Sequence, residues 1–409
     1  MDPARLKESW SRVAAHGDQA AAYFYSWLFL AHPEVRPMFE VSMAGQRDKL
    51  LAALGHIVSN VDDLEVVGAF AAALGRDHRK FEVEPKHYPA VGAALLSTLA
   101  YFEGESWTPE LAADWETAYG LLSQVMTEAA ADAARTTPPW WDAEVIAHQR
   151  RLPDLAVITV RPITPVPYVP GQSMYVETAL RPRAWRLLSP ANTPRADGTV
   201  EFHVRSIVGG AVSPALVYSL RVGDTLRLGA PLGSRLTLAG VGGRDLLLVA
   251  SGTGLAPLRA LVEQIALNAR RIRPPQVALL VAARDERDLY DRATIDALAG
   301  SCTWLSVEYT VPSFTGQSFA GSGGIEDPAD LADVADHVAR RAAAAAAGGD
   351  RLVYVCGSAA VNTAAERRLL EAGVPSRDVR IEQFDNHKYV KGETGPASAP
   401  AGRPGVEAR

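Results

Sequence analysis

The chain has 409 residues, a formal net charge of −6 at pH 7 and a hydrophobic content of 48%. This length predicts several domains that each bury a core, at about 100–200 residues per domain. No dense Lys/Arg block is present to attract nucleic acid or an anionic membrane. The cysteines, Cys302 and Cys356, are too few for a disulfide framework. Neither a leader pattern nor a run of about 18 apolar residues occurs, so we expect a cytoplasmic protein without a membrane span.

The N-terminal third of the chain is predicted to be helical. Apolar residues recur there at helical spacing, as at Leu50, Leu54 and Val61, and glycine and proline are sparse. The segment 136–141 contains a proline pair, which stops a helix and stiffens a connection. We therefore expect an all-α domain over residues 1–135 and a linker over residues 136–145.

Short apolar segments separated by Gly, Pro, Asn and Asp follow the linker. Many short strands at close spacing are typical of an antiparallel β-barrel, which we place at residues 146–240. The expected strands are Ala156–Val160, Ser173–Thr178, Val200–Val204 and Thr225–Leu228.

From about Arg244, apolar strand candidates alternate with helical segments. This alternation predicts an α/β domain over residues 241–390, with a parallel sheet and helices on both faces. Residues 391–409 are rich in Gly, Pro and Ala and are predicted to be disordered. The expected strands are Leu246–Ala250, Val277–Ala282, Trp304–Val311, Leu352–Val355 and Val379–Phe384, with helices over Ala256–Asn268 and Ala329–Arg341.

Two turns at strand ends could bind a dinucleotide. Gly252-Thr253-Gly254 leaves a strand and opens a helix, where backbone amides can approach a phosphate. Alone this signal is weak and is also compatible with a plain strand–turn–helix, because the turn lacks the third glycine and the following acidic residue of the Rossmann fingerprint. Cys356-Gly357 ends a later strand, where ligands bind in open α/β sheets, although a free cysteine can simply be buried.

The order G-x-G-x-x-P, then C-G about one hundred residues later, then a terminal E-x-F resembles the pyridine-nucleotide domain of the ferredoxin-reductase superfamily. The resemblance implies NAD(P)H binding. Arg284 could meet the 2′-phosphate of NADPH, but Asp285 and Glu286 would repel it, so we favour NADH. The implied residues are Gly252, Thr253, Gly254 and Pro257 at the diphosphate, Cys356 and Gly357 near the nicotinamide, and Phe384 beside the flavin.

The middle domain carries a flavin pattern. Residues 186–192, R-L-L-S-P-A-N, resemble R-x-Y-S-x-A-N of the same superfamily, and P-G-Q at 170–172 and G-G-A-V-S at 209–213 resemble two of its turns. The resemblance implies FAD, with its pyrophosphate near Arg186 and its isoalloxazine near Ser189. In the superfamily, the tyrosine of this pattern stacks on the flavin, but this chain has Leu188 at that position. We therefore expect weaker or differently tuned FAD binding, unless Trp185 or another ring fills the gap. The implied FAD residues are Gln172, Arg186, Ser189, Gly209, Gly210, Val212 and Ser213.

The helical domain resembles the globin of flavohaemoglobins. The resemblance implies haem b, with His78 as the proximal iron ligand and Phe39 stacked on the porphyrin. Tyr25 would donate a hydrogen bond to bound dioxygen, with Gln46 and Leu50 beside it, although Tyr25 could instead be structural within an aromatic cluster. The matching residues are Tyr25, Pro33, Phe39, Gln46, Leu50, His78 and Tyr88, with Ala118-Tyr119-Gly120 in the last helix.

One departure falls on the proximal side. In flavohaemoglobins, a glutamate ten residues after the glycine of the Ala-Tyr-Gly motif hydrogen-bonds the proximal histidine, and a tyrosine that matches Tyr88 supports this glutamate. The residue at the position of the glutamate is Ala130 in this chain. Glu128 and Asp132 lie about 200° away around the helix and cannot substitute. Without a carboxylate partner, His78 would donate less electron density to iron.

The resemblance to flavohaemoglobins spans residues 1–390. It implies electron transfer from NAD(P)H through FAD to haem, and oxidation of nitric oxide by dioxygen to nitrate, in a monomer that binds only small molecules. The implied catalytic residues are Tyr25, Gln46, His78 and Tyr88. Ala130 and Leu188 leave two alternatives open: a divergent haem/FAD reductase for other donors or acceptors, and a gas or redox sensor with a weak reductase.

Overall fold

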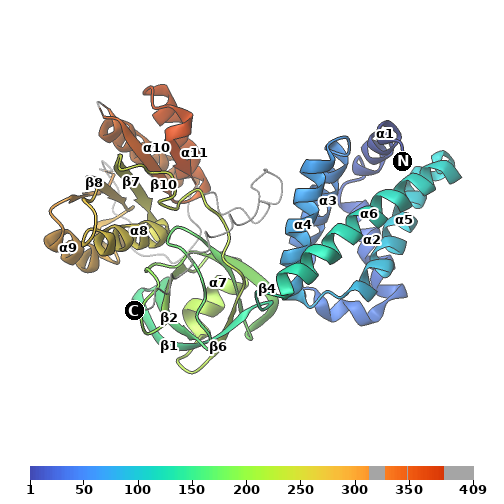
Figure 1. The fold of residues 1–409 in the computed structure, drawn as a ribbon, viewed down its shortest axis with the longest axis horizontal. Coiled ribbons are helices and arrows are strands. Elements are labelled where there is room, and N and C mark those ends of the chain that lie inside the picture. The colour runs from blue at the N-terminus through green and yellow to red at the C-terminus, as the bar shows by residue number, and fades with distance from the viewer. Residues whose placement is uncertain (313–327, 348, 382–409) are drawn as a thin grey trace, which may run out of the picture.

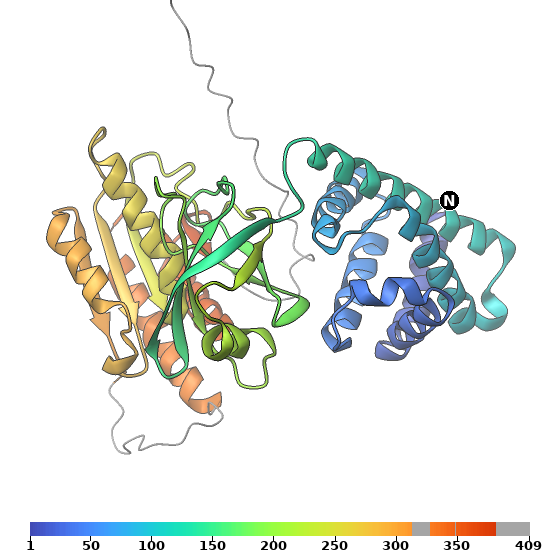
Figure 2. The same cartoon turned by 90° about the horizontal axis from the view of Figure 1, so that it is seen from below.

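The computed structural model describes residues 1–312, 328–347 and 349–381. Figures 1 and 2 show a helical unit at one end of the molecule, an α/β unit at the other, and a curled sheet between them. The predicted fold class, an all-α domain followed by an antiparallel β domain and a parallel α/β domain, is confirmed. Within the described ranges, no helix is both long and apolar enough to cross a membrane.

The helical unit begins and ends its helices at clear sequence signals. Asp2, Asp63 and Thr108 are N-caps whose side chains accept hydrogen bonds from the first free amides of their helices. The last helix ends at Ala134, just before the proline pair. The helices are α1 (Pro3–Ala14), α2 (Asp18–Ala31), α3 (Ala44–Ser59), α4 (Leu64–His78), α5 (Tyr88–Glu103) and α6 (Pro109–Ala134), with 3₁₀ turns at Pro33–Met38, Arg79–Phe81, Pro85–His87 and Gly104–Ser106.

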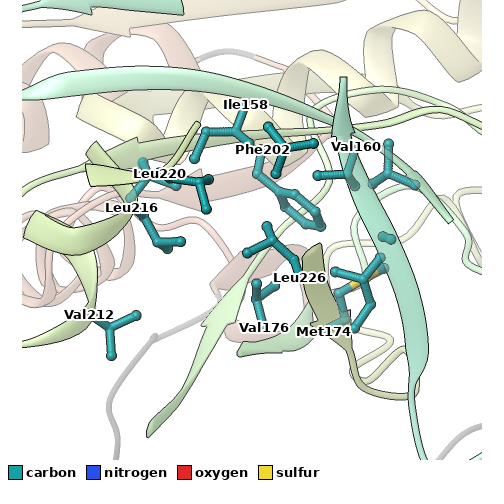
Figure 3. Close-up of a cluster of buried hydrophobic side chains, with 14 of the residues drawn as sticks. Ile158, Val160, Met174, Val176, Phe202, Val212, Leu216, Leu220 and Leu226 are labelled. Carbon is teal, nitrogen blue, oxygen red and sulfur yellow. The ribbon is translucent and has the colours of Figure 1, made fainter. Parts of the chain in front are cut away.

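The middle unit is a six-stranded antiparallel sheet in the order β4-β3-β6-β1-β2-β5. A bridge from Pro190 to Phe202 links the segment after β4 to β5 and curls the sheet around an apolar interior. Figure 3 shows Phe202, Met174 and Leu226 in that interior. The strands are β1 (Trp141–Leu152), β2 (Leu155–Pro162), β3 (Met174–Thr178), β4 (Arg181–Leu188), β5 (Val200–Arg205) and β6 (Thr225–Leu228), with the short helix α7 (Val212–Pro214) and a π turn at Ala215–Ser219.

The expected linker over residues 136–145 is wrong for residues 141–145. Strand β1 begins at Trp141, and Trp141, Ala143 and Val145 alternate into the barrel core. Trp141 and Ala143 pair with Leu228 and Leu226 of β6, and Val145 pairs with Val160 of β2. The connection between the first two units is therefore shorter than the sequence suggested.

The α/β unit has a parallel sheet in the order β11-β10-β7-β8-β9. Alternate residues of β7 face opposite layers: Leu246 and Leu248 pack beneath α8 and α9, while Leu247 and Val249 pack beneath α10 and α11. Both faces are thus buried, which explains the continuous apolar run. The elements are β7 (Asp245–Ser251), α8 (Leu255–Asn268), β8 (Val277–Ala282), α9 (Arg292–Ser301), β9 (Leu305–Thr310), α10 (Pro328–Ala346), β10 (Arg351–Cys356), α11 (Ala359–Glu371) and β11 (Val379–Ile381).

Candidate functional site

His78 is the last residue of α4 and is half-buried. Its Nδ1 lies 2.7 Å from the carbonyl oxygen of Leu74. A carbonyl can only accept, so Nδ1 carries the proton and Nε2 keeps its lone pair. Withdrawal from water lowers the pKa of His78, which favours the neutral imidazole that binds iron. The structure therefore presents His78 in the form that a haem ligand requires.

The hydrogen-bond partner of His78 within the described residues is a neutral carbonyl, not a carboxylate. The adjacent carboxylate of Asp77 pairs instead with the ammonium of Lys80. The Tyr88 carbonyl oxygen accepts a hydrogen bond from the Tyr119 hydroxyl at 2.6 Å, and Tyr88 lines a pocket together with Thr127 and Glu128 of α6.

Tyr25, Phe39 and Gln46 are brought together from three elements, as the sequence suggested. The Tyr25 hydroxyl lies 3.5 Å from the Gln46 carbonyl oxygen, which is long for a hydrogen bond, so this hydroxyl can turn to another acceptor. The Phe39 ring meets the Tyr25 ring edge-on, with 5.6 Å between centroids. Burial raises the pKa of Tyr25 far above its ordinary value, so the group stays a neutral donor.

The apolar side chains of the helical unit fit a haem. They form two separate clusters, one holding Tyr25 with Phe39 and Leu50, the other holding Leu74 between α4 and α6. Helix α3 fully buries only Val58 among its apolar residues, and the rest stay partly exposed. A flat apolar group between α3 and α4 would cover these side chains.

Gly75 sets the position of the helix that carries His78. A Cβ at Gly75 would lie 2.1 Å from the carbonyl oxygen of Met126, so α4 and α6 pack backbone against backbone there. We did not predict this contact. The available signal was a glycine inside an otherwise apolar helical segment, which often marks close packing.

The flavin motifs meet beside β4. Helix α7, which follows the Gly209-Gly210 turn, contacts β4, and Gly209 has a left-handed φ of +76°. Ser189 is buried, and its Oγ lies 2.9 Å from Oγ of Ser173. Val212 packs into the barrel core. The structure therefore collects the predicted Ser189 and the glycine turn at one place.

Two of the predicted flavin residues shape turns. Gln172 accepts a hydrogen bond from the Val169 amide at 2.9 Å and donates one to the Gly233 carbonyl at 3.2 Å. Ser213 Oγ accepts one from the Ile207 amide at 3.0 Å. Both side chains thus hold loops in place, so their contribution to a flavin site is the backbone path of these loops.

Whether FAD fits this place can be judged from Trp185, Arg186 and Leu188 of β4. Trp185 is 4% exposed, and its indole N–H has no partner among the described residues. An unpaired buried donor costs about 1–3 kcal/mol, which an acceptor oxygen of a bound flavin could remove. Arg186 donates to the Trp185 carbonyl at 2.8 Å and lies 3.4 Å from Glu40 of the helical unit. Leu188 packs against the barrel core. The residues fit FAD, although Leu188 provides no ring.

The two predicted nucleotide turns touch each other. Strands β7 and β10 are parallel neighbours, so the turns that follow them meet at one sheet edge. A Cβ at Gly254 would lie 2.0 Å from the Cys356 carbonyl oxygen, and Gly252 has a left-handed φ of +56°. Cys356 itself is fully buried. The backbone of these turns, rather than the thiol, is therefore what a nucleotide would meet.

Other predicted nucleotide residues have clear positions. Pro257 is the third residue of α8, where the lack of an N–H does no harm. Nε of Arg284 donates to Asp288 at 3.3 Å, and Asp288 also lies 3.5 Å from Arg205 of β5. The charge of Arg284 is therefore engaged within the protein. Phe384, predicted beside the flavin, lies outside the described residues.

A buried charged network joins the barrel to the α/β unit and was not predicted. Arg259 of α8 is 4% exposed and lies 2.8 Å from Glu201 and 2.9 Å from Asp291. His203 of β5 bonds the Tyr290 hydroxyl at 2.8 Å. Burial alone would raise the pKa of Glu201, but hydrogen bonding to His203 and the charge of Arg259 outweigh it and lower that pKa to about 2. The available signal was an arginine on the apolar face of α8.

Arg259→Leu should destabilise the reductase part by about 3–5 kcal/mol, because it leaves the buried carboxylate of Asp291 without its cation and Glu201 with only the more distant Arg195. Urea unfolding followed by flavin fluorescence measures this effect. Arg287→Leu is the matched control, since the Arg287 side chain is 88% exposed. Equal urea midpoints for Arg259→Leu and the control would show that the network does not hold the two units together.

Comparison with known proteins agrees with this architecture. The globin family model matches residues 22–126, the oxidoreductase FAD-binding domain matches 143–235, and the oxidoreductase NAD-binding domain matches 248–367. Two flavohaemoproteins, from Deinococcus radiodurans (28% identity, 95% of its length) and Pseudomonas putida (26% identity, 96% of its length), each align with 93% of the chain.

Solved structures show the same fold. A flavohaemoglobin of Malassezia yamatoensis with bound FAD and haem matches 94% of this chain and 98% of its own, with a TM-score of 0.68 and 17% identity. The ferredoxin reductase of carbazole 1,9a-dioxygenase matches 61% of this chain and 71% of its own, with a TM-score of 0.50 and 26% identity. The protein is therefore an oxidoreductase in which a haem-binding globin precedes FAD- and NAD-binding domains. Over 93% of its length it is similar to flavohaemoproteins.

Proposed function

We propose that the protein is an NAD(P)H-dependent nitric oxide dioxygenase that forms nitrate from nitric oxide and dioxygen. The observation that carries the proposal is the pairing in one chain of His78, which keeps a lone pair on Nε2, with a reductase whose nucleotide turns meet at one sheet edge. When bound, FAD divides a two-electron hydride into single electrons, and haem supplies the reduced iron at which dioxygen and nitric oxide react.

The protein's own residues would bind the haem and orient the dioxygen. Nε2 of His78 would hold the iron, while the Leu74 carbonyl fixes the orientation of the ring. Tyr25 would donate a hydrogen bond where dioxygen gains negative charge, with Gln46 and Leu50 beside it and Phe39 against the porphyrin. Tyr88 packs against the cluster that holds Leu74, so it would support the proximal side of the haem.

In the reductase, we propose that the amides of the Gly252–Gly254 turn and the start of α8 bind the nucleotide diphosphate. Arg186, Ser189 and the Gly209-Gly210 turn would hold FAD. NADH is the proposed donor, because Arg284 is already paired with Asp288 and neighbouring carboxylates would repel a 2′-phosphate. A cytoplasmic location and a monomeric state stay predictions.

One observation favours a second candidate, a haem/FAD reductase that serves other donors or acceptors. The His78 ring is hydrogen-bonded to the neutral carbonyl of Leu74. This arrangement would push less electron density toward iron than a carboxylate partner would. A gas or redox sensor with a weak reductase would have the same proximal side.

Nitric oxide consumption in air with NADH tests the proposal. The proposal predicts rapid NADH-dependent loss of nitric oxide, with nitrate formed in an amount equal to the nitric oxide lost, and slower turnover with NADPH. Reduction of quinones or peroxides without nitric oxide loss would favour the second candidate. Absence of NADH oxidation with every acceptor would favour the sensor.

Tyr25→Phe should speed dioxygen release from the reduced protein about 10- to 100-fold, because a hydrogen bond to a charged group contributes about 1.5–3 kcal/mol. Stopped-flow dissociation kinetics measure this rate. Tyr23→Phe is the matched control, because the Tyr23 ring stacks on Tyr101 at 4.4 Å. An unchanged rate in Tyr25→Phe would leave Tyr25 a packing residue.

A further inference from the structure

The segment that follows His78 lies against the barrel. Lys80, on the 3₁₀ turn Arg79–Phe81, has its ammonium 3.4 Å from the ring centroid of Tyr175 on β3, and it pairs with Asp77 on its other side. Lys80 is 4% exposed. A cation over a ring is held more strongly when water is excluded. The contact of Lys80 with Tyr175 therefore fixes the segment that follows His78 on the barrel.

A second contact lies two residues further along the chain. Glu82 accepts a hydrogen bond from the guanidinium of Arg183 on β4 at 2.6 Å. These residues have φ of 61° and 66°, and they are the non-glycine residues with positive φ in the described part of the chain. Left-handed backbone is unfavourable for such residues and persists only where surrounding contacts impose it. Glu82 and Arg183 are thus both held in unfavourable backbone conformations, which place the carboxylate of one beside the guanidinium of the other.

The contacts of Lys80 with Tyr175 and of Glu82 with Arg183 lie on β3 and β4, the strand pair beside the flavin motif. Tyr175 of β3 pairs with Leu187 of β4, and the neighbouring pair is Val176 with Arg186. Ser189 follows directly after β4. Figure 1 shows β4 where the barrel meets the helical unit. A short path therefore links His78, through Lys80 and Tyr175, to the strand pair beside the proposed flavin.

We infer that Lys80 and the Glu82–Arg183 pair are positioning residues that set the distance and orientation between the haem and the flavin. The inference rests on the proposed function. In the step concerned, one electron from the NADH-reduced flavin passes to ferric iron; the flavin is oxidised, the iron is reduced, and no bond is made or broken. Small displacements of reacting groups can change a rate by about 10²-fold, so these residues set the speed of electron transfer without touching either cofactor.

The test uses the full-length holoprotein and two variants on opposite sides of the contact, Lys80→Met and Tyr175→Leu. Anaerobic stopped-flow with NADH follows flavin reduction near 450 nm and haem reduction at the Soret band. Both variants should keep the wild-type rate of flavin reduction and reduce haem about tenfold more slowly or worse. Lys80→Arg should recover most of the rate, because arginine also binds over a ring. Lys86→Met is the matched control, since Lys86 is an exposed lysine of the same unit and pairs with Glu84.

A second readout does not depend on the cofactors. Hydrogen exchange of the cofactor-free chain should rise in residues 77–82 and 174–188 of both variants and stay unchanged in Lys86→Met. A wild-type rate of haem reduction in both variants overturns the inference. Unchanged hydrogen exchange in residues 77–82 and 174–188 overturns it as well. Equal slowing of flavin and haem reduction also overturns it, because that result shows a general loss of structure. Failure of the proposed function is distinguishable, since the wild-type haem would then not be reduced by NADH, and that result overturns both.

Discussion

His78→Gly is expected to lose NADH-driven haem reduction while keeping reduction of the flavin. The Nε2 lone pair of His78 is the ligand that we assign to iron, and its orientation depends on the Leu74 carbonyl. Changes to the partners of a metal ligand already cost about 10- to 100-fold in metal affinity, so removal of the ligand should weaken haem binding by more than about 100-fold. The haem-to-protein absorbance ratio and the Soret shift after anaerobic NADH addition measure both effects.

Added imidazole gives this experiment an internal check. It should enter the space left by the side chain and restore part of the haem binding in His78→Gly. The control is His32→Ala, because His32 contacts Glu34 at the surface, away from the proximal helix. A His78→Gly protein that kept the wild-type haem spectrum without imidazole would contradict the assignment of the proximal ligand.

Gly254→Ala is expected to abolish NADH binding and to leave haem binding intact. Its Cβ would lie 2.0 Å from the Cys356 carbonyl oxygen and 2.8 Å from the Gly357 nitrogen, so the two turns must separate. Overpacking of this kind costs typically about 1–3 kcal/mol and shifts the backbone. The amides that we assign to the diphosphate would then no longer converge. Flavin reduction by NADH should fall by about 100-fold or more, because small misplacements have effects of that size.

Dithionite should still reduce the flavin of Gly254→Ala, which separates loss of nucleotide binding from loss of FAD. Gly300→Ala is the matched control, since nothing lies within 4 Å of a Cβ at Gly300 of α9 and its φ is not in the left-handed region. A wild-type dissociation constant for NADH in Gly254→Ala would contradict the proposed nucleotide site.

Fold class could be predicted because the buried strands and helices carry strong periodic patterns. Strand β7 is buried on both faces and is therefore apolar throughout. Strands β1 and β4 were missed for the opposite reason. β4 lies at the edge of its sheet, contains three arginines and Pro182, and is exposed at its start. β1 ends in a polar, exposed stretch, and its apolar residues lie within what resembled a linker.

The candidate sites divide in the same way. A turn within one contiguous motif could be predicted: the Gly252–Gly254 turn leaves strand β7 and opens helix α8, as expected. Contacts between distant segments could not, because they depend on how completed elements pack. Gly75 against Met126, Arg259 against Glu201, and Lys80 over Tyr175 are of this kind. The carbonyl partner of His78 likewise required the coordinates.

We propose above all that this one chain carries electrons from NADH through FAD to haem. The most direct test is the absorption spectrum of the purified protein without oxygen, before and after addition of NADH. We expect a Soret band with a flavin band, and conversion of ferric haem to ferrous haem after NADH is added. A Soret band without flavin, or haem that stays ferric in the presence of NADH, would contradict it.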